Sequence, residues 1–88
     1  MTPQVRAKVL ERDGWKCVFC GRTDTLQMAH YIPRSLGGLG IEENLVTLCL
    51  ECHMKSHNEW FRELDQFMEQ YLNERYPNIT NDERKYRK

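Results

Sequence analysis

Two pairs of cysteines constrain the fold of this 88-residue chain more than any other feature. Cys17 and Cys20 form one C-x-x-C pair, and Cys49 and Cys52 form the other. Zinc binds four thiolates in a tetrahedron, and two such turns supply them. A chain this short builds only a small core, so it usually needs a staple such as a bound metal. We therefore predict a structural Zn²⁺ that ties the N-terminal third of the chain to a C-terminal helix.

The cysteines have an alternative interpretation as redox dithiols or disulfides. No βαβ pattern surrounds either pair, which weakens the redox interpretation. The N-terminus shows no apolar signal segment, and no stretch approaches the roughly 20 apolar residues of a membrane span. We therefore expect a cytoplasmic, reducing location and no membrane partner, and in that setting cysteine pairs are metal ligands more often than disulfides.

The charge balance gives no evidence for a polyanionic partner. Lys plus Arg and Asp plus Glu are both 13, so the formal net charge is zero. Such a balance is mild evidence against strong non-specific binding to DNA.

Helices are predicted at both ends of the chain. Thr2 as N-cap, Pro3 at the first position and Gly14 at the end indicate a helix from Thr2 to about Asp13. A second helix should begin near Cys49 and run long, because apolar residues recur at helical steps as far as Tyr76-Pro77. These residues are Trp60, Phe61, Leu64, Phe67, Met68, Tyr71 and Leu72. We interpret the stripe as a core face, and the alternative is a helix that pairs with a second copy of the chain.

Short strands are predicted between the helices. They are the apolar run 15–21, the weakly alternating segment 26–32 and the run 45–48. The segment 33–44 has three glycines and no period, so it is predicted to be a loop, and loops of this length in small domains tend to be functional. These elements predict a small α+β fold in a single domain over residues 1–78, followed by a flexible charged tail over residues 79–88.

All three histidines lie between positions 30 and 57. On a helix, His53 and His57 share a face, so their imidazoles can converge on a second cation. The alternative is a surface pair, because this spacing is common by chance. His30 stands just before the long loop, where a packed or solvated role is the ordinary one. Asn44 ends that loop, where its ordinary role is to hydrogen-bond its own turn.

Four segments, in the order CVFCG, AHYIPRSLGG, EENLVTLC and ECHMKSH, resemble the HNH endonuclease family. The resemblance covers about residues 12–57. It implies a ββα-metal (His-Me finger) core of two strands and a helix, stapled by zinc between the four cysteines. An N-terminal helix and a long C-terminal helix flank this core.

The resemblance also implies roles for individual residues. His30 matches the general base that activates a water, and Asn44 matches the asparagine that orients this base or its loop. His53 and His57 match ligands of a catalytic divalent ion, which would be Mn²⁺, Ni²⁺, Mg²⁺ or Zn²⁺. At the position before His30 the family often has Asp or His as a further ligand, whereas this chain has Ala29.

The function implied by the resemblance is metal-dependent hydrolysis of DNA, by nicking or by double-strand cutting. The alternative is a zinc-stapled DNA-binding module of the same fold that does not cleave. Arg34 and Lys55 flank the motif residues and are either phosphate contacts or solvated surface. Association with the family suggests a phage or mobile element, the host-cell cytoplasm and a partner in phage packaging.

Overall fold

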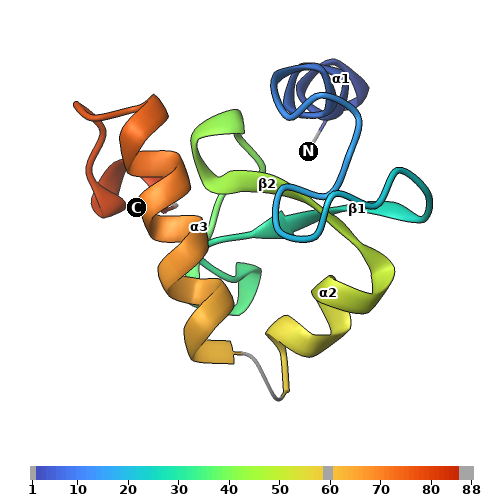
Figure 1. Ribbon diagram of the computed structural model, residues 1–88. Coiled ribbons are helices and arrows are strands. Elements are labelled where there is room, and N and C mark those ends of the chain that lie inside the picture. The colour runs from blue at the N-terminus through green and yellow to red at the C-terminus, as the bar shows by residue number, and fades with distance from the viewer. Residues whose placement is uncertain (1, 59–60, 86–88) are drawn as a thin grey trace.

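A two-stranded antiparallel sheet forms the centre of the computed structural model, which describes residues 2–58 and 61–85. β1 (Leu26–His30) pairs with β2 (Leu45–Cys49), with Leu26 opposite Cys49 and His30 opposite Leu45. α2 (Leu50–Ser56) follows β2 without a gap (Figure 1). This is the ββα arrangement predicted from the sequence, within a small α+β fold.

α1 (Pro3–Arg12) packs over one side of this core, as the sequence predicted. The Val5 N–H donates to the Thr2 hydroxyl at 3.2 Å, which caps the helix. Gly14 follows the helix with φ of +74°, a conformation that glycine adopts without strain. On the sheet side, α1 buries Val9 and Leu10 against Met28 and Leu45; these four residues form the smaller of two hydrophobic clusters.

The segment 15–21 was predicted to be a strand, and this prediction is wrong. It folds as tight turns, because most of its backbone hydrogen bonds close on nearby residues; a single bond, from the Val18 N–H to the Thr47 carbonyl at 3.0 Å, joins it to β2 and does not make a ladder. The Cys17 N–H donates to the Arg22 carbonyl at 2.7 Å, and the Gly21 N–H donates to the Cys17 carbonyl at 2.9 Å. Gly21 has φ of +84°, which reverses the chain. The turn brings Cys17 and Cys20 to the same side.

The single long C-terminal helix was also predicted wrongly, since the structure has two helices. α2 ends at Ser56, and α3 spans Phe61–Arg75. Asn58 donates its side-chain N–H to the Met54 carbonyl at 3.0 Å, which satisfies a carbonyl that a continuing helix would have used. The break lets both helices pack on the larger cluster, which contains Cys52 of α2, Leu64, Met68 and Leu72 of α3, and Ala29, Val46 and Leu48 of the sheet.

Two aromatic residues of the predicted stripe are engaged within the chain. Phe67 packs edge-on against Phe19, with ring centroids 5.2 Å apart, and the Tyr71 hydroxyl donates to Asp13 at 2.6 Å. Trp60 lies outside the described residues. Pairing of two chains through this helix stays a prediction.

Arg12 and Asp13 connect α1 to β2 and α3. The carboxylate of Asp13 accepts hydrogen bonds from the Arg12 guanidinium (2.7 and 3.0 Å), the Thr47 N–H (2.9 Å) and the Tyr71 hydroxyl. Arg12 also donates to the carbonyls of Glu42 and Leu45. A buried ion pair of this kind stabilises a fold only when its remaining hydrogen-bonding groups are satisfied, and here they are.

The segment expected to be a flexible tail instead packs on the domain as far as residue 85. Asn81–Arg84 form a 3-10 helix whose start has a capping box between Thr80 and Glu83. The guanidinium of Arg84 is buried, and it donates to the Glu43 carbonyl at 2.6 Å and the Asn81 side-chain oxygen at 2.8 Å. The Cζ atom of this guanidinium also lies over the ring of Tyr31, 5.6 Å from its centroid. These contacts order a segment that looks like a charged terminus in the sequence.

Within the described ranges, no helix is both long enough and apolar enough to cross a membrane.

Candidate functional site

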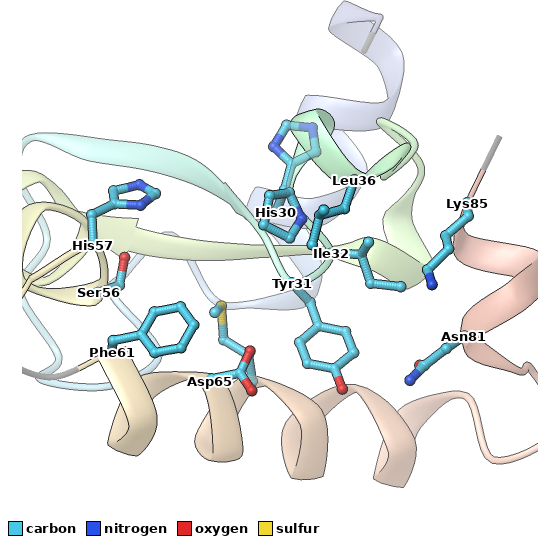
Figure 2. Close-up of a pocket in the computed structure, with 12 residues that line it drawn as sticks. His30, Tyr31, Ile32, Leu36, Ser56, His57, Phe61, Asp65, Asn81 and Lys85 are labelled. Atoms are coloured by element: carbon cyan, nitrogen blue, oxygen red, sulfur yellow. The ribbon is translucent and has the colours of Figure 1, made fainter.

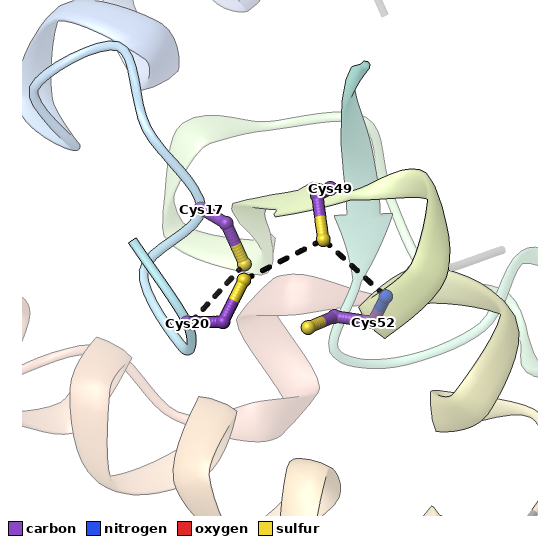
Figure 3. A group of neighbouring side chains, drawn as sticks. All are labelled: Cys17, Cys20, Cys49 and Cys52. Carbon is purple, nitrogen blue, oxygen red and sulfur yellow. Dashed lines mark hydrogen bonds between the residues drawn. The ribbon is translucent and has the colours of Figure 1, made fainter. Parts of the chain in front are cut away.

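The four cysteine thiols meet where the turn after α1 approaches the start of α2 (Figure 3). Their sulfur atoms all lie within 4.8 Å of one another, and the Sγ atoms of Cys20 and Cys49 are 3.6 Å apart. Zinc–sulfur bonds of about 2.3 Å in a tetrahedron place the sulfurs about 3.8 Å apart. A disulfide would need a separation of about 2.05 Å. The geometry therefore fits a metal ion and not a disulfide.

The surroundings of the thiols favour the same conclusion. The Cys20 N–H points at the Cys17 sulfur and the Cys52 N–H points at the Cys49 sulfur, both at 3.5 Å. Burial opposes ionisation of Cys17, but backbone N–H groups outweigh it and lower the pKa of this thiol to about 7. Burial and the neighbouring thiols raise the pKa of Cys52. A cation that displaces the thiol protons removes this conflict, so the cluster can hold a structural metal such as zinc.

His30 is the last residue of β1, where the chain leaves the sheet for the loop. Its ring is half-buried, and Nε2 is enclosed without a hydrogen-bond partner among the described residues. Burial lowers the pKa of His30, and the positive charge of Arg34 lowers it further. The imidazole is therefore neutral at pH 7. Buried polar groups without partners are uncommon in native proteins, and one cause is a catalytic role.

Asn44 is fully buried and fastens the loop that follows His30. Its side-chain oxygen accepts the Ile32 N–H at 2.9 Å, and its amide donates to the carbonyls of Ile32 (3.1 Å) and Leu39 (2.9 Å). The Asn44 carbonyl also accepts the Tyr31 N–H at 2.9 Å. The side chain thus acts on the backbone just beyond His30, and its donors are both in use.

His53 and His57 share one face of the segment that begins at α2, as the sequence predicted. Their ring centroids lie 5.1 Å apart. Nδ1 of His53 is 2.7 Å from Oε1 of Gln27 on β1. Because that oxygen can only accept, Nδ1 carries the proton and Nε2 keeps a free lone pair for a ligand. Gln27 was missed from the sequence; the only signal was its alternation with Ala29 on one face of the strand.

The three histidines do not form a compact cage. Of the potential ligands in residues 2–58 and 61–85, only the cysteines form a group of three or more whose ligand atoms lie within 4.8 Å. Ala29 is 2 % exposed and belongs to the hydrophobic cluster, so this position contributes packing and no ligand. A cation held by His53 and His57 would take its other ligands from water or substrate.

His30 and His57 both line a pocket of about 250 Å³ between β1 and α3 (Figure 2). His30 contributes from the sheet and His57 from the end of α2. Of the two suggested phosphate contacts, Arg34 is exposed and its charge acts on His30. Lys55 forms an ion pair with Glu51 at 3.1 Å on α2. The charge of Arg34 thus acts on the candidate site at His30, whereas the charge of Lys55 is paired with a neighbour on its own helix.

Comparison with known proteins identifies the family. The protein-family model described as HNH endonuclease matches residues 17–59 of this sequence. The type IV methyl-directed restriction enzyme EcoKMcrA of Escherichia coli (strain K12) is 33% identical over 64 residues, which are 62% of this chain and 23% of that enzyme. Anaredoxin of Nostoc sp. (strain PCC 7120 / SAG 25.82 / UTEX 2576) is 31% identical over 55 residues, which are 61% of this chain and 72% of anaredoxin.

The match therefore spans about a quarter of the restriction enzyme, and only the shared region is comparable. The region matched by the family model begins at the first cysteine of the cluster and ends just beyond His57, so it contains the cysteines, the sheet and α2. On this match and the ββα core that it covers, the chain belongs to the HNH endonuclease family.

Proposed function

We propose that this chain is a metal-dependent endonuclease that hydrolyses DNA phosphodiester bonds, by nicking or by double-strand cutting. One observation carries the proposal: a neutral, half-buried His30 lines the same pocket as His57. Residues from the sheet and from the end of α2 thus face one space, as a hydrolytic site requires.

In this proposal His30 is the general base. Its lowered pKa keeps the ring neutral near pH 7, so that it can take a proton from a water molecule as the water oxygen attacks phosphorus. Nε2 is enclosed by protein, so the proton would be accepted at Nδ1. Asn44 is a positioning residue, because it holds the backbone at Ile32 and Tyr31 and thereby the end of the strand that carries His30.

His53 and His57 would hold the catalytic divalent ion. The hydrogen bond from Nδ1 of His53 to Gln27 presents Nε2 as the ligand atom and fixes the ring. A divalent ion bound there supplies a Lewis acid for the phosphate and stabilises the leaving oxygen. Imidazole ligands suit Mn²⁺, Ni²⁺ or Zn²⁺ better than Mg²⁺. Arg34 would contact a phosphate, and Lys55 would do so only by leaving Glu51.

A second candidate function is DNA binding without cleavage. The observation that favours it is Ala29, which occupies the position of a further ligand and is packed in the core. A site with two protein ligands binds its ion more weakly than a site with three. In this case the zinc-stapled fold would only position DNA.

The test is relaxation of a supercoiled plasmid by zinc-loaded protein with added Mn²⁺, Ni²⁺ or Mg²⁺, beside a His30→Ala variant purified identically. We expect nicking that needs the added ion, is faster with Mn²⁺ or Ni²⁺ than with Mg²⁺, and disappears in the variant. DNA binding without cleavage by folded protein in every lane would establish the second function, and Ala29→Asp is then the variant that should restore a ligand.

The biological setting is proposed from the family association alone. It consists of a phage or mobile element, the cytoplasm of the host cell and a packaging partner. A second copy of the chain, bound through α3, is the other proposed partner. The solution mass across a concentration series tests the latter, since a dimer would dissociate on dilution.

A further inference from the structure

We propose that the pocket between β1 and α3 binds one unpaired base of the DNA strand, next to the phosphodiester that His30 serves. The inference rests on the proposed function and adds to it a subsite and a substrate class: DNA with an unpaired or extruded base. It is carried by the size, lining and position of the pocket.

The size of the pocket fits a single ring system. Its volume is about 250 Å³, somewhat below the roughly 300 to 1,000 Å³ of sites for drug-sized ligands. Figure 2 shows the pocket running from His57 and Phe61 at one end to Asn81 and Lys85 at the other, with Tyr31 between them. Such a space accepts a planar base and excludes a base pair.

The lining combines apolar faces with one carboxylate. Phe61 and Leu36 line the pocket and are 56% and 67% exposed. Exposed apolar side chains that gather beside a pocket often mark a binding site. Met68 lies buried deeper in the lining. A base that stacks on an aromatic ring gains affinity whatever its identity. Pockets for extruded bases combine such apolar walls with hydrogen bonds to the base edge.

Asp65 supplies a polar group for that edge. It lies on α3 among the lining residues, and burial, with a further contribution from Glu69, raises the pKa of its carboxyl group. A phosphate would be repelled by this carboxylate, whereas the N–H groups on the edge of a base can donate to it. Asp65 therefore favours a base over a phosphate in the part of the pocket that is lined by α3.

The position of the pocket links it to the reacting phosphate. His30 and His57 belong to the same lining, so a strand whose phosphate lies at these histidines has the neighbouring base within reach. Arg34 and Lys85 place positive charge beside the pocket for the strand's other phosphates. A base stacked in a duplex cannot enter, which is why the proposed occupant is unpaired.

Methyl resonances of the methionines provide the direct test. The protein, zinc-loaded and without other divalent ions, carries [¹³C-methyl]methionine. Met68 reports on the pocket, whereas Met28 lies in the cluster under α1 and Met54 is exposed on α2. Three DNA probes share one sequence: a fully paired duplex, a duplex with a one-base bulge, and the same bulge with an abasic residue.

We expect the bulged base to shift the Met68 resonance and the abasic bulge to leave it unchanged. In fluorescence anisotropy, the preference of the protein for the bulged base over the abasic bulge should fall roughly fivefold or more in Phe61→Ala. Trp15→Ala is the matched control, since Trp15 is an aromatic residue with 57% exposure outside the pocket, and it should keep the preference.

The outcomes separate this inference from the proposed function. If DNA perturbs the His30 and His57 ring signals but Met68 responds equally to both bulges, the base subsite is wrong and DNA binding stands. If no probe perturbs any signal, the proposed function itself fails. A Met68 shift that follows protein concentration without DNA would show that a second copy of the chain occupies the pocket, and would also overturn the inference.

Discussion

Removal of the Asp13 carboxylate should destabilise the protein more than removal of any exposed acid. The Asp13 side chain has no exposed surface, and its partner Arg12 is only 14% exposed. Asp13→Ala leaves this guanidinium without its anion and leaves the Thr47 N–H and Tyr71 hydroxyl without their acceptor. Breaking a buried pair from one side costs about 3–5 kcal/mol. A domain of this length has about 4–13 kcal/mol of stability in total, so the loss would be a large share of it.

The assay is urea unfolding followed by far-ultraviolet circular dichroism, at a fixed excess of zinc so that metal binding contributes equally to every variant. Tyr71→Phe removes one of the hydrogen bonds to Asp13 and should lower the free energy of unfolding by about 1–2 kcal/mol. This milder variant tests the same network if Asp13→Ala does not fold. Asp24→Ala is the control. Its pair with Arg22 (2.8 Å) is exposed on both sides and contributes at most about 1 kcal/mol.

The same network predicts a dependence on pH. Burial alone would raise the pKa of Asp13, but the hydrogen bonds from Arg12 and Tyr71 and the charge of Arg12 lower it below its ordinary value. The contribution of the ionised group is complete above the unfolded pKa of about 4 and is lost as the pH falls through the folded pKa. Asp13→Asn should therefore lose less stability on acidification than the wild type. A cost for Asp13→Ala equal to that of Asp24→Ala would refute this account.

Four further outcomes are expected. Asn44→Ala removes the side-chain partners of two buried backbone groups of Ile32 and of the half-buried Leu39 carbonyl, and should cost at least about 3 kcal/mol in urea unfolding. Arg84→Ala should lower the free energy of unfolding by about 2–4 kcal/mol, whereas Arg62→Ala at an exposed position should lower it by less than about 0.5 kcal/mol. If residues 79–85 were a flexible tail, the two substitutions would have the same small effect. Gln27→Leu should move the proton of His53 off Nδ1 in ¹⁵N spectra and weaken binding of Mn²⁺ about 10- to 100-fold. Removal of the structural metal by a strong chelator should abolish the helical dichroism, and zinc should restore it.

The sequence alone predicted the elements whose signals are local. The Thr2-Pro3 start and Gly14 end of α1 depend on capping and on backbone freedom within a few residues, and the structure has both. The strands that contain His30 and Thr47 follow from short apolar runs bounded by turn residues. The C-x-x-C spacing likewise predicted which sulfurs would come together, because each pair forms its own turn.

The failures occurred where distant contacts decide the backbone. The segment around Cys17 is apolar enough for a strand, but the N–H groups of Cys17 and Gly21 bond within the turn, and only the Val18 N–H reaches β2. The apolar periodicity continues from α2 into α3 in the sequence, whereas in the structure the Asn58 side chain takes the Met54 carbonyl and both helices pack on one core. The charged end looked solvated, because the carbonyl of Glu43 that binds Arg84 is far away in the sequence.

At the candidate site, the sequence determined which ligand types are available, and the tertiary structure determined how these side chains are oriented and which pocket they line. The number and spacing of the cysteines and histidines fixed which ions could be bound, since ligand type is a property of the residues themselves. Only the fold could show that Gln27 orients His53, that Asn44 holds the loop after His30, and that the pocket beside His30 continues onto α3. Each of these depends on groups brought together from separate elements, and hydrogen bonds and cavities between elements exist only once the core has packed.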